Sequence, residues 1–159
     1  MPDLVVWKGG KMVEKPDLNE KGVARERKEH GRRNVAVVGL RNADDQILMI
    51  RTNRLPSRWQ PIGGGVESSD KSPADALIRE VFEELSISLD PSDLKAVLQA
   101  PYDFGEGTVF FYEAFFDPRV HRIKIDTEEI AESRWFDLSE AMRLPVFPAT
   151  KTFLKILSR

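Results

Sequence analysis

The feature that most constrains this chain is an amphipathic helix that carries three glutamates shortly after a run of three glycines. The run "GGG" stands at 63–65, and "REVFEEL" follows at 79–85. Ser72 and Pro73 predict the start of the helix, because serine is a good N-cap and proline favours the first helical position. At about 100° per residue, the apolar side chains of 72–86 form one stripe, and the glutamates form an adjoining face. The helix is therefore expected to bury one side in a core and to present carboxylates beside it.

The glutamate face needs an explanation, because like charges three and four residues apart on a helix repel by roughly 0.2–0.5 kcal/mol per pair. Glu80, Glu83 and Glu84 lie on this face. One interpretation is a solvated acidic surface. The other is a cation site, since glycines before the helix let the backbone approach a ligand and expose its amides and carbonyls. Oxygen ligands without histidine or cysteine select Mg²⁺ or Mn²⁺, and these ions also bind phosphates.

Composition excludes several other kinds of site. The chain of 159 residues has no cysteine, which rules out disulfides, thiolate metal sites and a cysteine nucleophile. His30 and His121 are far apart in sequence and form no cluster of metal ligands. A net charge of −2 gives no basic field for specific nucleic-acid binding. No apolar run reaches the ~18–20 residues that span a bilayer, and no signal-peptide pattern is present, so we expect a cytoplasmic protein without membrane attachment.

The pattern along the chain predicts one α/β domain at 34–159, preceded by an N-terminal extension at 1–33. In the extension we expect a small hairpin and then a charged linker, whose basic run at 25–33 is either a solvated surface or a phosphate contact. In the domain, strands are expected at 34–40, 47–54, 94–104, 108–118 and 132–138, and helices at 72–86, 138–143 and 149–157, with a short strand leading into a glycine loop at 58–67. The first two strands look like a hairpin. This order predicts a mixed sheet sandwiched by helices.

The stretch 63–87 resembles the Nudix box, G-x5-E-x7-R-E-U-x-E-E-x-G-U, in which U is a bulky aliphatic residue. The segment "REVFEELSI" matches the second half of the box, except that Ser86 replaces the glycine. Glycine at that point normally permits a left-handed residue at the helix end. Ser86 is therefore either strained there, or the helix continues through it.

The first half of the box aligns in two ways. Starting from Gly65 keeps the spacing but puts Lys71 where the first glutamate belongs. Starting from Gly64 puts Asp70 there, with one extra residue before Arg79. We prefer the second alignment, because it keeps an acid that can pair with the arginine.

The resemblance implies a fold, an activity and a set of site residues. The fold is a Nudix-like α/β/α sandwich with a mixed β-sheet. The activity is Mg²⁺- or Mn²⁺-dependent hydrolysis of the diphosphate bond in a nucleotide-type small molecule. The implied metal ligands are the carbonyl of Gly63 and the carboxylates of Glu80, Glu83 and Glu84, and the implied catalytic residues are Arg79, Glu83 and Glu129. Arg79 would orient the glutamates, while Glu129, with Glu128 as second choice, would act as the base or as another ligand.

Substrate contacts are less sharply indicated. Arg51 and Trp59 precede the glycine run and are predicted to bind the substrate through phosphate and base, respectively. Further candidates for these two roles are Arg54, Arg58, Tyr102, Phe104, Phe110 and Phe111. At strand spacing such aromatic residues are also typical of a core. Nucleoside triphosphates, ADP-ribose, nucleotide sugars and dinucleoside polyphosphates all stay open as substrates, and a homodimer stays open as an assembly.

Two other functions compete with hydrolysis. The first is a non-catalytic nucleotide-binding module of the same fold, against which the intact glutamate triplet argues. The second is an enzyme that resembles isopentenyl diphosphate isomerase. Such an enzyme implies protonation by cysteine and glutamate and a histidine-rich metal site. The absence of cysteine and the two scattered histidines argue against the isomerase.

Overall fold

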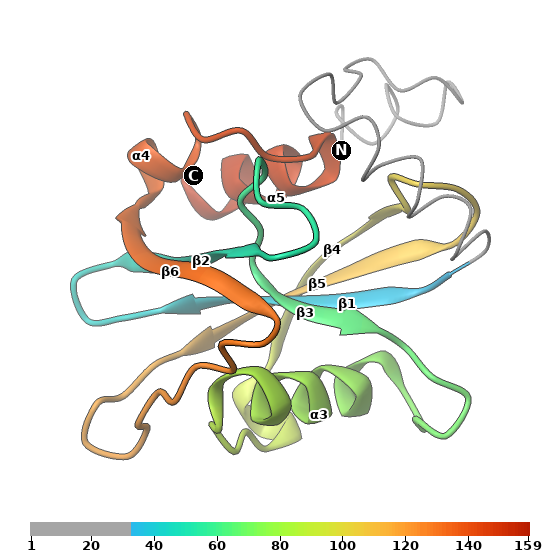
Figure 1. Cartoon of the computed structure of the whole chain (residues 1–159), viewed down its shortest axis with the longest axis horizontal. Helices are drawn as coiled ribbons and strands as arrows, with labels where there is room; N and C mark the ends of the chain where they lie inside the picture. Colours follow the sequence, from blue (N-terminus) through green and yellow to red (C-terminus); the bar gives the residue numbers. More distant parts are fainter. Residues whose placement is uncertain (1–32) are drawn as a thin grey trace.

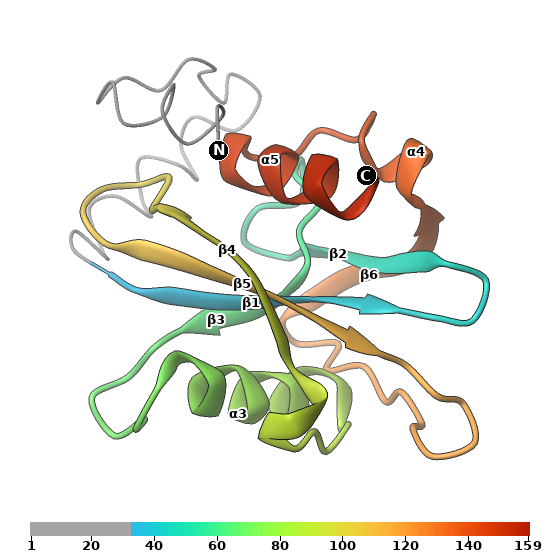
Figure 2. The same cartoon turned by 180° about the vertical axis from the view of Figure 1, so that it is seen from behind.

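The computed structural model describes residues 33–159, and the predicted hairpin and linker at 1–32 lie outside the described residues. A six-stranded sheet lies between helix α3 on one face and helices α4 and α5 on the other (Figures 1 and 2). The elements are β1 Val35–Arg41, β2 Gln46–Thr52, β3 Ile62–Gly65, α3 Pro73–Leu85, the 3₁₀ turn η1 Pro91–Asp93, β4 Lys95–Pro101, β5 Thr108–Phe115, β6 Ile130–Asp137, α4 Leu138–Ala141 and α5 Pro148–Leu157. The predicted α/β/α sandwich is confirmed.

The sheet is mixed, as predicted, but its first hairpin opens. The strand order is β4-β5-β1-β2-β6, with β3 paired to β1 beside this path. Strand β1 runs parallel to β5 along its whole length, while its antiparallel register with β2 is recorded only at Arg41↔Ile47. Beyond that pair, β3 takes the place next to β1, from Val35↔Gly65 to Val38↔Ile62. The glycines expected in a loop are therefore part of a strand.

Two apolar clusters, one on each face of the sheet, hold the layers together. On one face, Leu77, Val81 and Leu85 of α3 are fully buried against side chains of β1 and β2. On the other face, Phe153 of α5 stacks on Phe111 of β5, with ring centroids 4.6 Å apart. Each fully buried side chain of this size contributes about 1.5–3 kcal/mol to folding. These clusters fix α3 against the strands that carry the glycines.

Helix α3 begins and ends where the sequence indicates. The hydroxyl of Ser72 accepts a hydrogen bond from the amide of Asp75 at 3.1 Å, and Pro73 is the first helical residue. The helix stops at Leu85, because Ser86 adopts left-handed backbone angles with φ 59°. Of the two alternatives for this position, the structure therefore shows the strained residue rather than a longer helix.

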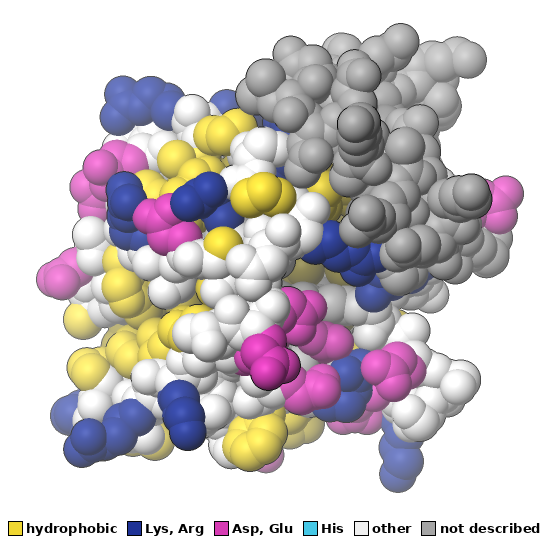
Figure 3. Space-filling model, in the orientation of Figure 1, with side chains coloured by type: hydrophobic (Ala, Val, Ile, Leu, Met, Phe, Trp, Pro, Cys, Tyr) yellow, Lys and Arg dark blue, Asp and Glu magenta, His cyan; other side chains and the backbone are white. Residues whose placement is uncertain are grey.

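The surface carries charges of both signs, and one group of acidic side chains gathers over β3 and α3 around a basic one (Figure 3). Within residues 33–159, we find no helix with the length and apolar character needed to cross a membrane.

Candidate functional site

Arg79 of α3 forms ion pairs with several acidic side chains around it. Its Nε and Nη2 atoms donate to the two carboxylate oxygens of Asp70, at 3.2 and 2.9 Å. Its Nη1 atom donates to Glu80 at 3.1 Å and to Glu83 at 2.9 Å. Nη2 also reaches the carbonyl oxygen of Gly65 at 3.2 Å. The guanidinium therefore relieves part of the repulsion on the glutamate face and ties α3 to β3.

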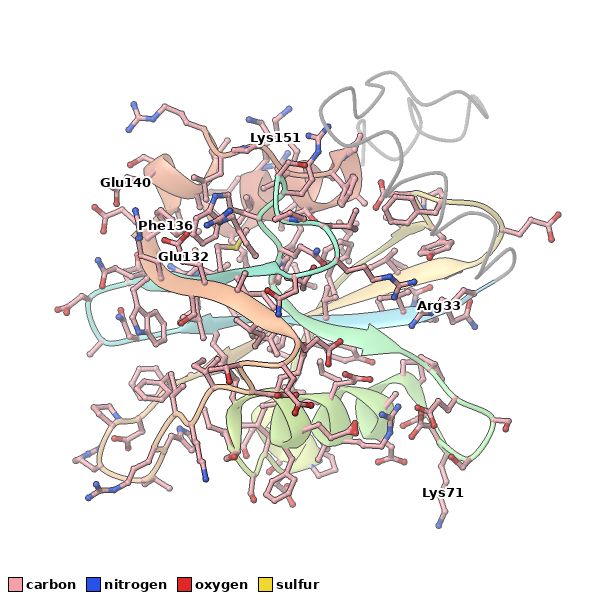
Figure 4. All side chains as sticks on the ribbon, in the orientation of Figure 1. Arg33, Lys71, Glu132, Phe136, Glu140 and Lys151 are labelled. Carbon is pink, nitrogen blue, oxygen red and sulfur yellow. The ribbon has the colours of Figure 1, made fainter. Side chains whose placement is uncertain are left out.

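Asp70, rather than Lys71, faces the arginine. The Asp70 side chain is only 7% exposed, and its bond with the Arg79 guanidinium holds the pKa of the carboxyl below its usual value. Lys71 is exposed and points away from the helix (Figure 4). The structure thus confirms the pairing expected from the preferred alignment of the box.

Glu84 is the most buried of the three glutamates, with 3% of its surface exposed. Burial, followed by the carboxylates of Glu80 and Glu129, raises the pKa of Glu84 to about 9. Its Oε1 atom is buried and has no hydrogen-bond partner among the described residues. An unpaired buried carboxylate oxygen is costly, so the position favours either protonation or a bound cation.

Glu80 lies directly over the glycine strand. A Cβ atom on Gly64 would lie 2.5–2.7 Å from the atoms of the Glu80 carboxyl group, so any other residue there would displace this carboxyl group. At Gly63 a Cβ would fall 2.1 Å from the carbonyl oxygen of Ala36 on β1. Burial raises the pKa of Glu80, and Arg79 partly offsets this effect. The first two glycines thus let a strand backbone pack against both a carboxylate and a neighbouring strand.

A long segment between β5 and β6 brings further acids to the end of α3 (Figure 1). The amide of Lys124 donates to the carbonyl of Leu85 at 2.8 Å, and the amide of Asp126 donates to that of Glu84 at 3.0 Å. These bonds satisfy carbonyls at the helix end and draw Glu129 close enough to act on the pKa of Glu84. The predicted base candidate is therefore beside the predicted ligand.

A cleft of ≈ 500 Å³ opens where these elements meet. Its lining includes the carboxylates of Glu84, Asp126, Glu128 and Glu129, the arginines Arg33 and Arg54, and the aromatic rings of Tyr102 and Phe104. Gly63 to Gly65 form part of its wall. Sequence reasoning named most of these residues but missed Asp126, which belongs to the same acidic run as Glu129. It also left Arg33, beside β3 in Figure 4, undecided between solvent and phosphate.

Arg51 and Trp59, predicted to bind substrate, lie outside the residues that line the cleft. Arg51 forms an ion pair with Glu132 of β6, and its guanidinium carbon lies 5.3 Å from the centroid of the Trp59 ring. Trp59 packs edge-on against Phe136 of β6, with ring centroids 5.0 Å apart. Glu132 and Phe136 are labelled in Figure 4. Alternation along β2 turns Arg51 to the face covered by α4 and α5, and Trp59, in the connection after β2, belongs to the apolar cluster on that face.

Three other candidate substrate residues, Arg58, Phe110 and Phe111, are also absent from the lining of the cleft. Arg58 is buried, with its guanidinium carbon 5.2 Å from the ring of Phe147. Phe111 belongs to the core, and Phe110 packs against the cluster on the α3 face. For these aromatic residues of β5 the core alternative therefore describes the structure.

The carboxylates of the site suit a hard divalent cation, although two of them, Glu80 and Glu83, form ion pairs with Arg79. Within residues 33–159, no three acidic or histidine side chains are already gathered as a metal-binding group. The ion pairs explain this, because they draw Glu80 and Glu83 toward the guanidinium. The unpartnered oxygen of Glu84, with acidic residues and no thiol or imidazole among the lining residues, matches the preference of Mg²⁺ or Mn²⁺.

Among curated proteins, the chain is similar to diphosphoinositol polyphosphate phosphohydrolase 3-alpha of Mus musculus. The two are 29% identical over 105 residues, which cover 64% of this chain and 60% of the mouse protein. The chain thus spans less than two thirds of the length of the curated relatives that it matches.

Two solved structures show the same fold. The MutT protein of Methanosarcina mazei superposes with a TM-score of 0.64 at 22% identity, over 81% of this chain and 94% of that one. The E. coli dihydroneopterin triphosphate pyrophosphohydrolase superposes with a TM-score of 0.65 at 17% identity, over 81% and 99% of the two chains. The family model of the NUDIX domain matches residues 30–156, which is most of the chain. This protein therefore belongs to the Nudix family.

Proposed function

We propose that this protein is a Mg²⁺- or Mn²⁺-dependent hydrolase that cleaves the diphosphate bond of a nucleoside diphosphate linked to another group. The observation that carries the proposal is the buried carboxyl group of Glu84, which has one oxygen without a hydrogen-bond partner among the described residues and whose pKa is raised by burial and by the carboxylates of Glu80 and Glu129. Such an arrangement costs stability unless a cation or a proton compensates it.

In this proposal each residue of the site has a distinct task. Glu80 and Glu84 hold the cation together with the carbonyl of Gly63, and Glu83 adds a further carboxylate. Arg79 orients the glutamates through its ion pairs. When bound, the cation neutralises the diphosphate oxygens and makes the phosphorus easier to attack. Glu129, which lines the cleft, takes the proton from the attacking water.

The lining of the cleft favours a nucleotide over a more highly charged substrate. Among its described residues, Arg33 and Arg54 are the cationic side chains, and they face four carboxylates. An inositol polyphosphate carries many phosphates and needs a strongly basic lining. Tyr102 and Phe104 are the aromatic residues of the lining; both are largely buried in the core, so a base would stack on the small part of each ring that stays exposed. We therefore propose a nucleotide-type substrate, although the curated relatives are named for inositol substrates.

The test is a substrate panel in the presence of Mg²⁺, with products identified by mass. The panel contains nucleoside triphosphates, ADP-ribose, nucleotide sugars, dinucleoside polyphosphates and a diphosphoinositol polyphosphate. Products from a nucleotide are expected, and products from the inositol compound alone would contradict the substrate class. Binding of Mg²⁺ and nucleotide without any product would favour the non-catalytic module.

A first prediction concerns Glu84→Gln. The amide keeps the shape of the side chain but removes the charge that binds the cation, so turnover should fall at least about 100-fold. Burial already favours the neutral form of Glu84 when no cation is bound, and glutamine is neutral as well, so the metal-free variant should melt at the same temperature as the parent protein or higher. Turnover and thermal melting are measured on the same preparations. Parental activity on any substrate that the parent protein hydrolyses would refute the assignment of Glu84.

A further inference from the structure

The segment that carries the acids of the cleft has no regular structure of its own. It runs from the end of β5 at Phe115 to the start of β6 at Ile130. Loops of more than about 12–15 residues without secondary structure are uncommon, and most of them serve a function. The last part of this one, Lys124 to Glu129, is here called the acidic loop. Its carboxylates can act at the cleft only if its backbone is held in place.

One side of the acidic loop is fixed by the end of α3, as described above. The other side is fixed by Asn53, which follows β2. The Nδ2 atom of Asn53 donates to the carbonyl of Glu128 at 2.9 Å and to that of Thr127 at 3.4 Å. The amide of Asn53 donates to the carbonyl of Glu129 at 2.9 Å. One residue thus contacts three successive carbonyls of the acidic loop.

The position of Asn53 makes these bonds informative. Asn53 lies at the rim of the cleft, next to a change of register between Arg51 and Thr52 where β2 leaves β6. The pairing between β2 and β6 ends at Thr52↔Ile130, so it does not fix the residues that precede Ile130. The amide side chain supplies two donors for two adjacent carbonyls, which a hydroxyl or a carboxylate at the same place cannot do.

From this geometry we infer that Asn53 is a positioning residue that holds the acidic loop in the cleft, so that Glu129 lies beside Glu84. This inference rests on the proposed function for its catalytic consequence, but its structural part does not. It assigns Asn53 an action through the loop rather than through direct contact with the substrate.

The structural part is tested by hydrogen–deuterium exchange of the metal-free chain of 159 residues. In Asn53→Ala, amides of the acidic loop are expected to exchange about tenfold faster, because the side-chain hydrogen bonds that hold the loop are lost. Asn53→Asp keeps the shape but loses both side-chain donors, so it should behave in the same way. Exchange in the acidic loop that matches the parent protein in both variants would overturn the inference.

Asn42→Ala is the matched control. The Asn42 side chain also makes several hydrogen bonds, but within the turn between β1 and β2, where its Oδ1 accepts from Asp44 at 3.0 Å and from Gln46 at 2.9 Å. This variant should speed exchange in its own turn and leave the acidic loop unchanged. A general loss of stability would instead speed exchange in the acidic loop in both the Asn42 and the Asn53 variants, and that result would also overturn the inference.

The catalytic consequence is tested by Mn²⁺ titration and steady-state kinetics. For Asn53→Ala we expect weaker Mn²⁺ binding and a kcat about tenfold lower, with KM changed less than about twofold. Asn53→Gln keeps the donors and should recover part of the loss. A higher KM at parental kcat would show a substrate contact instead and would overturn the positioning role. If no substrate is hydrolysed while Asn53→Ala still loosens the acidic loop, the proposed function fails and the anchoring by Asn53 stands.

Discussion

At the scale of single residues, the guanidinium group of Arg79 organises the site, because it pairs with several carboxylates. Arg79 contacts Asp70, Glu80 and Glu83 with nitrogen–oxygen distances between 2.9 and 3.2 Å. Its positive charge offsets part of the repulsion on the glutamate face but does not reach Glu84, which keeps a free oxygen. The arginine therefore orders the outer carboxylates and forms no ion pair with the inner one, Glu84.

The pair formed by Asp70 and Arg79 leads to a second prediction. Asp70→Asn leaves the guanidinium with one charged partner fewer, so metal-dependent activity and melting temperature should fall together. Lys71→Ala is the matched control, since Lys71 points into solvent and should tolerate the change (Figure 4). Both variants are measured by thermal melting and by turnover. A silent Asp70→Asn beside a damaging Lys71→Ala would show that the other alignment of the box is correct in function.

Asp103, in the turn between β4 and β5, is a second buried acid. It is 9% exposed, and burial raises its pKa to about 7, while a hydrogen bond from the amide of Ala149 partly offsets the effect. That bond, at 3.5 Å, links the turn between β4 and β5 to the first turn of α5. Tyr102 and Phe104 on either side of Asp103 line the cleft. The carboxyl group therefore helps to seat the aromatic part of the cleft wall.

A third prediction follows from the sign of this shift. The pKa of Asp103 is about 7 in the folded protein, whereas an exposed aspartate has an ordinary pKa of 3.8. The contribution of Asp103 to the free energy of unfolding is therefore complete below about pH 3.8. It is lost as pH rises through about 7. Asp103→Asn removes the titration, so its melting temperature relative to the parent protein should rise between about pH 5 and pH 8. The measurement is the melting temperature of both proteins at each pH. A difference between them that is the same at both pH values would contradict the prediction.

At the scale of elements, α3 and β3 depend on each other. Gly64 has no side chain beneath the Glu80 carboxyl group, so the glycine strand approaches the helix without displacing that carboxyl group. The helix in turn ends in a left-handed residue, so that the chain turns back toward the sheet and Ile87 joins the buried cluster on that face. Ser86 adopts this conformation at a cost, since left-handed angles disfavour residues that have a Cβ atom.

A fourth prediction therefore concerns Ser86→Gly. Glycine adopts the left-handed angles without strain, so the variant should be more stable by about 1 kcal/mol, which corresponds to a melting temperature about 2–4 °C higher. The gain is partly reduced by the greater freedom of glycine in the unfolded chain. Ser86→Ala, which keeps the strain, serves as the control and should show no gain. A glycine variant that melts at or below the parental temperature would contradict the account of the helix end.

At the scale of the whole molecule, the sandwich brings distant segments to one place. Residues of β1, β2 and β3, the end of α3, the turn after β4 and the loop before β6 all reach the same cleft. The two apolar clusters hold these segments from opposite faces of the sheet. The carboxylates are therefore held near each other by packing energy, although their charges oppose it.

This opposition gives a fifth prediction. A cation that binds the folded protein stabilises it by mass action, by about 2.7 kcal/mol at 100 times its dissociation constant. Mg²⁺ or Mn²⁺ should therefore raise the melting temperature of the parent protein and of Lys71→Ala, and a chelator should reverse the rise. Glu84→Gln should show little or none of it. An equal rise in Glu84→Gln would place the cation elsewhere.

The sequence by itself determined those features that depend on local chemistry. The cap at Ser72 and the apolar period fixed α3 to within one residue at each end. The helical period also ordered the glutamates, because it puts Glu84 next to the apolar stripe and Glu83 farthest from it, and the structure buries them in that order. The family and the mixed α/β sandwich were predictable for the same reason, since the box and the strand pattern are local.

The tertiary structure alone decided which distant residues meet. A strand pattern shows two faces but not which neighbour covers each face, so Arg51 and Trp59 were expected at the substrate and instead pack with β6. The opening of the first hairpin, which makes the glycine run a strand, depends on pairing across the sheet. The anchoring of the acidic loop by Asn53 joins residues more than seventy positions apart. Such contacts arise from the energy of the assembled core, which no short stretch of sequence contains.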